Sequence, residues 1–161
     1  MSDARWVDID EDVAAASRHF ASAVALHAAG GFDEDGLAGY RNGMALMHAL
    51  QSAHTSAEMA LTRLLAMMGE ERPIGEDWHQ KLISRAAKAI EGQGSRPAIL
   101  SPEVADDLDE TRRFRNRATR SYGAFDVSRI GPTIEAAGRL AASLALDFAS
   151  FKASIDPDTK G

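Results

Sequence analysis

The chain has 161 residues, a formal net charge of -6 and no cysteine. Its length suffices for one domain with a buried core but is short for two, so we expect a single domain over residues 1–161. The lack of cysteine excludes disulfide frameworks and thiol nucleophiles, and the acidic balance argues against a protein that coats nucleic acid through its overall charge.

Alanine, leucine and methionine are frequent while runs of β-branched residues are nearly missing, which predicts helices only. Gly30-Gly31 is a suitable end for the first helix, and Ser101-Pro102 a suitable N-cap and first turn for the fourth. The expected helices cover residues 9–29, 35–69, 76–91, 102–122 and 128–155, and a polar tail covers residues 156–161. This pattern predicts an all-α, up-and-down bundle of four to five helices.

The second predicted helix carries the longest stripe at the spacing of packed antiparallel helices. Its members are Leu37, Tyr40, Met44, Met47, Gln51, His54, Glu58, Leu61, Leu65 and Met68. We expect this stripe to face the neighbouring helices, with its three middle polar positions forming a layer in the seam.

The fourth predicted helix contains an unusual run of basic residues, because five of the nine residues from Arg112 to Arg120 are arginine. At about 100° per residue, Arg115 falls on the same face as the apolar Leu108. A buried guanidinium is costly unless it is paired, so Arg115 needs a polar partner. Gln51, His54 and Glu58 of the second helix are the candidates, and Glu58 is the first choice.

Two interpretations of this run remain open. In the first, Arg115 belongs to a polar layer that fixes helix register, while Arg112 and Arg113 pair with Asp109 on the helix surface. The neighbouring carboxylates Asp106-Asp107 and Asp109-Glu110 are then a solvated helix face. In the second, the arginines form a phosphate-binding patch, doubled if two copies meet along this helix. The patch would consist of Arg112, Arg115, Arg117 and Arg120.

The end of the basic run resembles the signature of the HepT-like branch of the HEPN family, in which a histidine follows an arginine after four to six residues. Arg115 matches the arginine, Asn116 the polar position after it and Tyr122 the tyrosine that closes the pattern. Arg120 stands where these proteins have the histidine.

Two further features agree with the resemblance, which covers roughly residues 45–155. Trp78-His79 and Leu82 are similar to a Trp-His-x-x-Leu segment of the same branch. Glu58 falls where those proteins carry a glutamate in the second helix.

The resemblance implies the toxin of a toxin–antitoxin pair. Such a toxin is a homodimer, here meeting through the fourth helix, whose shared cleft cuts RNA without metal. The signature arginine binds the scissile phosphate and the histidine moves a proton. A cognate minimal nucleotidyltransferase masks the toxin and, in some systems, adds adenylate to the signature tyrosine, here Tyr122.

Arg120 departs from this pattern at the position that matters most for proton transfer. Arginine stays charged up to a pKa above about 12, so Arg120 could only hold phosphate. Three explanations remain open: a naturally inactive member, a member with another base, or a substitution that allowed a toxic protein to be expressed. His79 and His54 are the available substitute bases, although a histidine beside a tryptophan at a helix start is more often structural.

We therefore predict a metal-independent endoribonuclease or a catalytically impaired relative. The alternatives are a non-catalytic docking or substrate-binding partner of a nucleotidyltransferase and, last, a helical scaffold. The histidines at 19, 27, 48, 54 and 79 include no i, i+4 pair, and no phosphate-binding glycine loop follows a strand, so we expect no metal and no cofactor. No apolar run approaches the roughly 18 residues of a membrane span, which favours a cytoplasmic protein.

Overall fold

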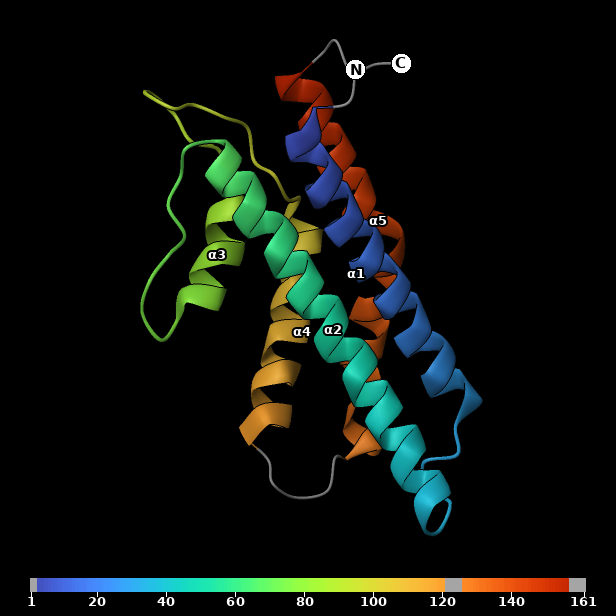
Figure 1. Ribbon diagram of the computed structural model, residues 1–161. Coiled ribbons are helices and arrows are strands. Elements are labelled where there is room, and N and C mark those ends of the chain that lie inside the picture. Colours follow the sequence, from blue (N-terminus) through green and yellow to red (C-terminus); the bar gives the residue numbers. More distant parts are fainter. Residues whose placement is uncertain (1–2, 121–125, 157–161) are drawn as a thin grey trace.

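A computed structural model of the chain describes residues 3–120 and 126–156, apart from the side chains of residues 119 and 120. This part is all-helical, as predicted. It contains α1 (Ala4–Ala29), α2 (Leu37–Met67), α3 (Trp78–Ala86), α4 (Pro102–Arg120), the 3₁₀ helix η1 (Val127–Arg129) and α5 (Gly131–Ile155). The short α3 lies beside the long helices α1, α2, α4 and α5 (Figure 1). Helices α1 and α2 run in opposite directions, as do α4 and α5.

The first helix begins five residues before its predicted start at residue 9. Asp3 caps it, because the Asp3 carboxylate accepts a hydrogen bond from the Arg5 backbone N–H over 3.0 Å. The added turn buries Trp6, whose ring also lies 5.0 Å from the Lys152 ammonium group of α5. The early start therefore extends the contact of the first helix with the end of α5 (Figure 1).

The third helix is shorter than the predicted 76–91 and ends at Ala86. The Ala86 carbonyl accepts hydrogen bonds from the backbone N–H groups of Ile99 and Leu100, which turns the chain back toward the bundle. Arg96, only 4% exposed, fixes the intervening loop by donating to the carbonyls of Lys88 and Pro97. A helix over residues 87–91 is thus replaced by a loop that tertiary hydrogen bonds hold in place.

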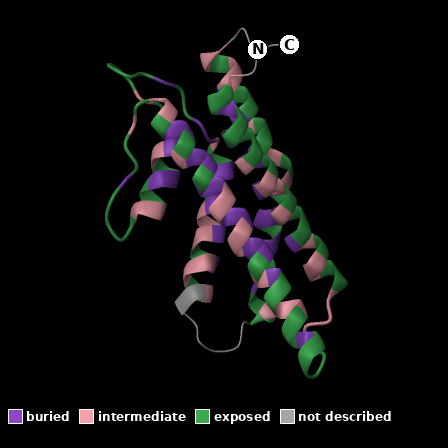
Figure 2. Cartoon of the chain, viewed as in Figure 1, coloured by how far each residue is buried: buried purple, intermediate pink, exposed green. Residues whose placement is uncertain are grey.

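The core lies where α1, α2, α4 and α5 meet, and Figure 2 shows buried positions concentrated along their facing sides. The predicted stripe is buried from His54 to Leu65, whereas Met68, just beyond the end of α2, is half-buried and the first members of the stripe are not buried. Leu37, Tyr40 and Met44 are 67%, 65% and 42% exposed. In Figure 1 the first turns of α2 extend beyond the facing ends of α4 and α5, which explains this exposure.

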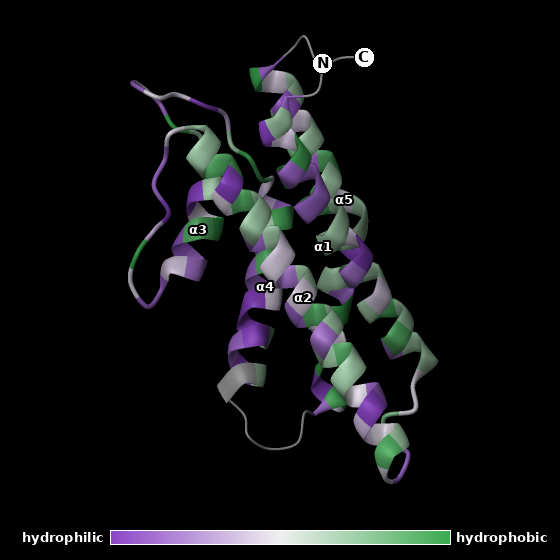
Figure 3. Cartoon of the chain, in the orientation of Figure 1, coloured by the Kyte–Doolittle hydropathy of each residue, from purple (hydrophilic) through white to green (hydrophobic). Residues whose placement is uncertain are grey.

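The other helices deviate from prediction only at their ends: α2 spans 37–67 instead of 35–69, and η1 takes the place of the first residues expected in α5. Figure 3 shows α4 as a largely hydrophilic ribbon, in keeping with its run of arginines and carboxylates. None of the helices in the described ranges is long and apolar enough to cross a membrane.

Candidate functional site

The predicted partner of Arg115 is present. Arg115 lies on α4 and donates a hydrogen bond from Nη1 to the Glu58 Oε1 atom of α2 over 2.7 Å. The Glu58 side chain is 6% exposed, whereas that of Arg115 is 29% exposed. The carboxylate therefore belongs to the interior and the guanidinium lies between it and solvent.

The second oxygen of Glu58 binds a histidine from another helix. His79, at the start of α3, lies with Nδ1 2.5 Å from Glu58 Oε2 and has a side chain that is 27% exposed. The centroid of its ring lies 3.6 Å from that of the neighbouring Trp78 ring. Arg72, on the loop before α3, places its guanidinium 4.6 Å from the centroid of the Trp78 ring. Glu58 thus joins α4 and α3 through two groups that both reach the surface.

A second histidine approaches the same carboxylate from below the surface. His54 is one helical turn before Glu58 on α2, is fully buried, and places Nε2 3.5 Å from Glu58 Oε2. Its Nδ1 lies 2.7 Å from the Thr111 hydroxyl of α4. We define the Glu58 cluster as Glu58, Arg115, His79, His54 and Thr111.

The electrostatics of this cluster favour an ionised carboxylate. Burial by itself would raise the pKa of Glu58, but the contacts of its carboxylate with the imidazole rings of His54 and His79 outweigh burial and lower the pKa below its ordinary value of 4.5. An ionised Glu58 can hold the Arg115 guanidinium in place and orient the imidazole of His79.

Gln51, the remaining predicted partner of Arg115, lies elsewhere. With His19 and His48 it lines a shallow polar hollow between α1 and α2. Asn116 follows Arg115 on α4 and is half-buried. The Arg120 side chain and Tyr122 lie outside the described residues.

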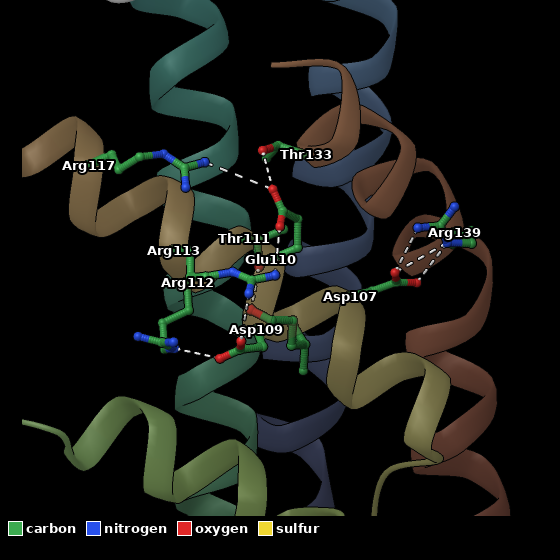
Figure 4. A network of polar contacts seen from close by, with 10 residues as sticks. Asp107, Asp109, Glu110, Thr111, Arg112, Arg113, Arg117, Thr133 and Arg139 are labelled. Atoms are coloured by element: carbon green, nitrogen blue, oxygen red, sulfur yellow. Dashed lines mark hydrogen bonds and ion pairs between the residues drawn. The ribbon is translucent and has the colours of Figure 1, made fainter. Parts of the chain in front are cut away.

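Arg112, Arg113 and Arg117 pair with carboxylates on α4 (Figure 4). Arg112 donates to Asp109 over 2.7 Å, as expected, and Arg113 lies 3.7 Å from the same carboxylate. Arg117 lies 3.9 Å from Glu110 and is 62% exposed. Arg112, at 14% exposed, is held close to the helix, so Arg117 presents more of its guanidinium to solvent.

The acidic face of α4 is only partly solvated, which corrects the sequence-based interpretation. Asp107 is buried and accepts hydrogen bonds from Arg139 of α5 at 2.9 to 3.2 Å, while Glu110 also accepts one from Thr133 over 3.0 Å (Figure 4). These contacts join α4 to α5. They went unnoticed in the sequence because carboxylates on adjacent positions look alike until the packing direction of the helix is known.

Thr111 is the member of the cluster that sequence reasoning missed. It lies four residues before Arg115, a spacing that places both on one face of α4. Threonine is common on helix surfaces, so only its burial and its contact with His54 distinguish it. Among the described residues, no group of three or more His, Asp or Glu side chains is arranged to hold a metal ion.

A groove of about 590 Å³ lies between the first half of α2, the end of α4 and η1. Its walls are mostly apolar and include Tyr40, Met44 and Phe114. The charged residues Arg117, Arg129, Glu34 and Asp126 also line it, two of each sign. The exposed first part of the α2 stripe therefore borders the same end of α4 that carries the signature.

Comparison with protein families gives one result that bears on these residues. The model of a family described as HepT-like protein matches residues 45–155, more than half of the chain. The matched span contains Glu58, His79 and Arg115. Searches of curated proteins and of solved structures gave no match.

Proposed function

Because the chain belongs to the HepT-like family, we propose that it is a metal-independent endoribonuclease toxin whose working groups are Arg115 and His79, both held by Glu58. The observation that carries this proposal is the geometry of one buried carboxylate: its Oε1 binds Arg115 at 2.7 Å and its Oε2 binds His79 at 2.5 Å. A cation for the phosphate and a group for proton transfer are thereby kept side by side at the surface.

In this proposal His79 takes over the proton transfer for which Arg120 is unsuited. Glu58 faces Nδ1 of His79, so Nε2 is the ring atom that meets the substrate. It accepts the proton of the ribose 2′-hydroxyl, whose oxygen attacks the adjacent phosphorus. The P–O5′ bond breaks, the departing O5′ takes up a proton from water, and a 2′,3′-cyclic phosphate and a 5′-hydroxyl result. His79 then gives the proton it accepted back to the solvent.

Arg115 stabilises the charge that develops on the phosphate oxygens, as a guanidinium does at other phosphoryl sites. Asn116 and Arg120 lie on the same stretch of α4, and we propose that they contact the scissile nucleotide. Arg112 and Arg117 would extend the phosphate-binding surface, Arg117 more effectively because of its greater exposure.

Metal-free cleavage of a mixed RNA in the presence of a chelator tests the proposal. Four proteins are compared: the natural sequence, Arg115→Ala, His79→Gln and Arg120→His. We expect the natural sequence to cut, and each of the first two variants to lose about a hundredfold or more in rate. Arg113→Ala is the matched control, since Arg113 is 54% exposed on the same helix and pairs locally with Glu110.

An inert natural protein combined with an active Arg120→His variant would instead identify a catalytically impaired member of the family. If all four proteins are inert, the endoribonuclease proposal is wrong.

A second function is favoured by Arg120 itself, which replaces the proton-transfer histidine of the signature. In that case the chain is a non-catalytic docking or substrate-binding partner of a nucleotidyltransferase, and Tyr122 is its site of adenylate addition. Co-purification with the nucleotidyltransferase encoded next to it, followed by mass spectrometry of the protein and of Tyr122→Phe, tests this function. An adenylate-sized mass increase that Tyr122→Phe lacks would support it, and failure to co-purify would count against it.

We further propose that the protein acts as a cytoplasmic homodimer. The exposed apolar residues Tyr40 and Met44 line the groove beside the end of α4, and covering them with a second copy would bring two signature segments together. The lack of cysteine suits a reducing compartment.

A further inference from the structure

The ring of His54 cannot meet a substrate, since it is fully buried, yet both of its nitrogens face polar groups of the Glu58 cluster. Nδ1 lies 2.7 Å from the Thr111 hydroxyl, and Nε2 lies 3.5 Å from Glu58 Oε2. The second distance is too long for an ordinary hydrogen bond, and Nε2 makes no other one within the described residues. The protons on this ring therefore decide whether it attracts or repels the carboxylate.

A proton on Nε2 is favoured by the charge opposite it. An unprotonated Nε2 would turn a lone pair toward the Glu58 carboxylate, and this repulsion is poorly screened in the interior. An N–H group in the same place is attracted to the carboxylate instead. The other ring nitrogen, Nδ1, is buried too and also needs a hydrogen-bond partner.

The Thr111 hydroxyl can satisfy Nδ1 in either charge state of the ring. Its oxygen also lies 3.0 Å from the carbonyl oxygen of Leu108, which can only accept. Beside a neutral ring the hydroxyl donates its proton to Nδ1. Beside a charged ring Nδ1–H donates to the hydroxyl oxygen, and the hydroxyl rotates to donate to Leu108. In both arrangements Nε2 keeps its proton toward Glu58.

We infer that Thr111 is a positioning residue of the Glu58 cluster: its hydroxyl holds the His54 ring with Nε2–H toward Glu58, which keeps the carboxylate turned to Arg115 and His79. Glu58 is then held from three sides, by α2 itself through His54, by α3 through His79 and by α4 through Arg115. The arrangement of protons does not depend on RNA cleavage; only the effect on catalysis rests on the proposed function.

The first experiment measures the proton positions directly, by nitrogen-15 NMR of the full chain labelled on histidine, with the His54 signals assigned by their loss in His54→Gln. We expect the His54 Nε2 signal to be that of a protonated nitrogen throughout the accessible pH range. Nε2 with the signal of an unprotonated nitrogen in the natural protein would overturn the inference.

The second experiment compares Thr111→Val with Thr111→Ser. Valine keeps the volume but has no hydroxyl, whereas serine keeps the hydroxyl. We expect Thr111→Val to shift the nitrogen signals of both His54 and His79 and Thr111→Ser to keep them near their natural positions. Identical spectra for the two variants would also overturn the inference, and Thr111→Ser keeps the test decisive if Thr111→Val folds poorly.

In the RNA assay, Thr111→Val should cut about tenfold more slowly or worse, because small displacements of working groups cost rate, while Thr111→Ser should cut at near the natural rate. If the NMR results agree but the natural protein does not cut RNA, the proposed function fails and the positioning role stands. If the natural protein cuts and Thr111→Val cuts equally well, the positioning role fails and the proposed function stands.

Discussion

Arg115 of α4 and Glu58 of α2 are 57 residues apart in the chain and are joined by a hydrogen bond of 2.7 Å between Nη1 and Oε1. The bond links a buried carboxylate to a guanidinium that still reaches solvent. This relationship makes the cluster both a structural joint between helices and a surface site, and both properties can be measured.

Replacing Glu58 by glutamine should destabilise the fold. Glutamine keeps the shape, but Arg115 loses the negative charge that compensates its own and His79 loses its carboxylate partner. We expect the free energy of unfolding to fall by about 2–3 kcal/mol, at the low end for a broken buried pair because both partners retain solvent contact. Urea denaturation followed by circular dichroism measures this change.

Asp8→Asn is the matched control for Glu58→Gln. Asp8 also pairs with an arginine, Arg63 at 3.5 Å, but its side chain is 61% exposed. Such a pair contributes little, so the change should stay below about 0.5 kcal/mol. Equal losses for the two variants would mean that the Glu58 cluster has no special role in stability.

The lowered pKa of Glu58 predicts how stability depends on pH. A carboxyl group with a folded-state pKa below its unfolded value binds fewer protons in the folded protein, so its contribution is complete above the ordinary value of 4.5 and is lost as pH falls through the lower folded value. The difference in the free energy of unfolding between the natural protein and Glu58→Gln should therefore shrink as the pH falls below about 4.5. A difference that stays constant down to acid unfolding would contradict the assignment.

Replacing Arg96 by methionine should loosen the segment between α3 and α4. Arg96 is 4% exposed and donates both to Glu70 and to the carbonyls of Lys88 and Pro97. We expect a loss of about 3 kcal/mol in the free energy of unfolding and faster protease cleavage within residues 87–97. Arg129→Met is the control, since Arg129 is 88% exposed, and it should leave both quantities unchanged.

The proposed homodimer predicts that a charge in the groove separates the subunits. Met44 is 42% exposed, so Met44→Glu should shift the protein to monomer without lowering its melting temperature. Leu146→Glu introduces the same charge at a 66% exposed position of α5 and should leave the dimer intact. Light scattering at micromolar concentration distinguishes the two. A natural protein that is already monomeric would rule out the dimer.

The sequence by itself determined the helical class, the end of the first helix, the start of the fourth and the end of the last, and it made Glu58 the first choice as partner of Arg115. Periodicity indicates which side of a helix faces inward. Local sequence signals are sufficient to place the start of the fourth helix: the Ser101 hydroxyl accepts a hydrogen bond from the Val104 N–H at 3.3 Å, as the Ser-Pro pair predicted. An arginine on an inward face needs a polar partner, and Glu58 is the first choice among the three candidates on the second helix.

Only the tertiary structure decided the rest, because it depends on how far each helix extends along its neighbours. Periodicity could not reveal that the first turns of α2 pass the ends of α4 and α5, which leaves Tyr40 and Met44 exposed. Periodicity also could not predict the early end of α3. That helix ends where the Ala86 carbonyl accepts hydrogen bonds from the backbone N–H groups of Ile99 and Leu100, beyond the next loop. The contact between His54 and Thr111 likewise depends on helix packing. Either side chain could bind water at the surface, and they pair because both are buried where water is excluded.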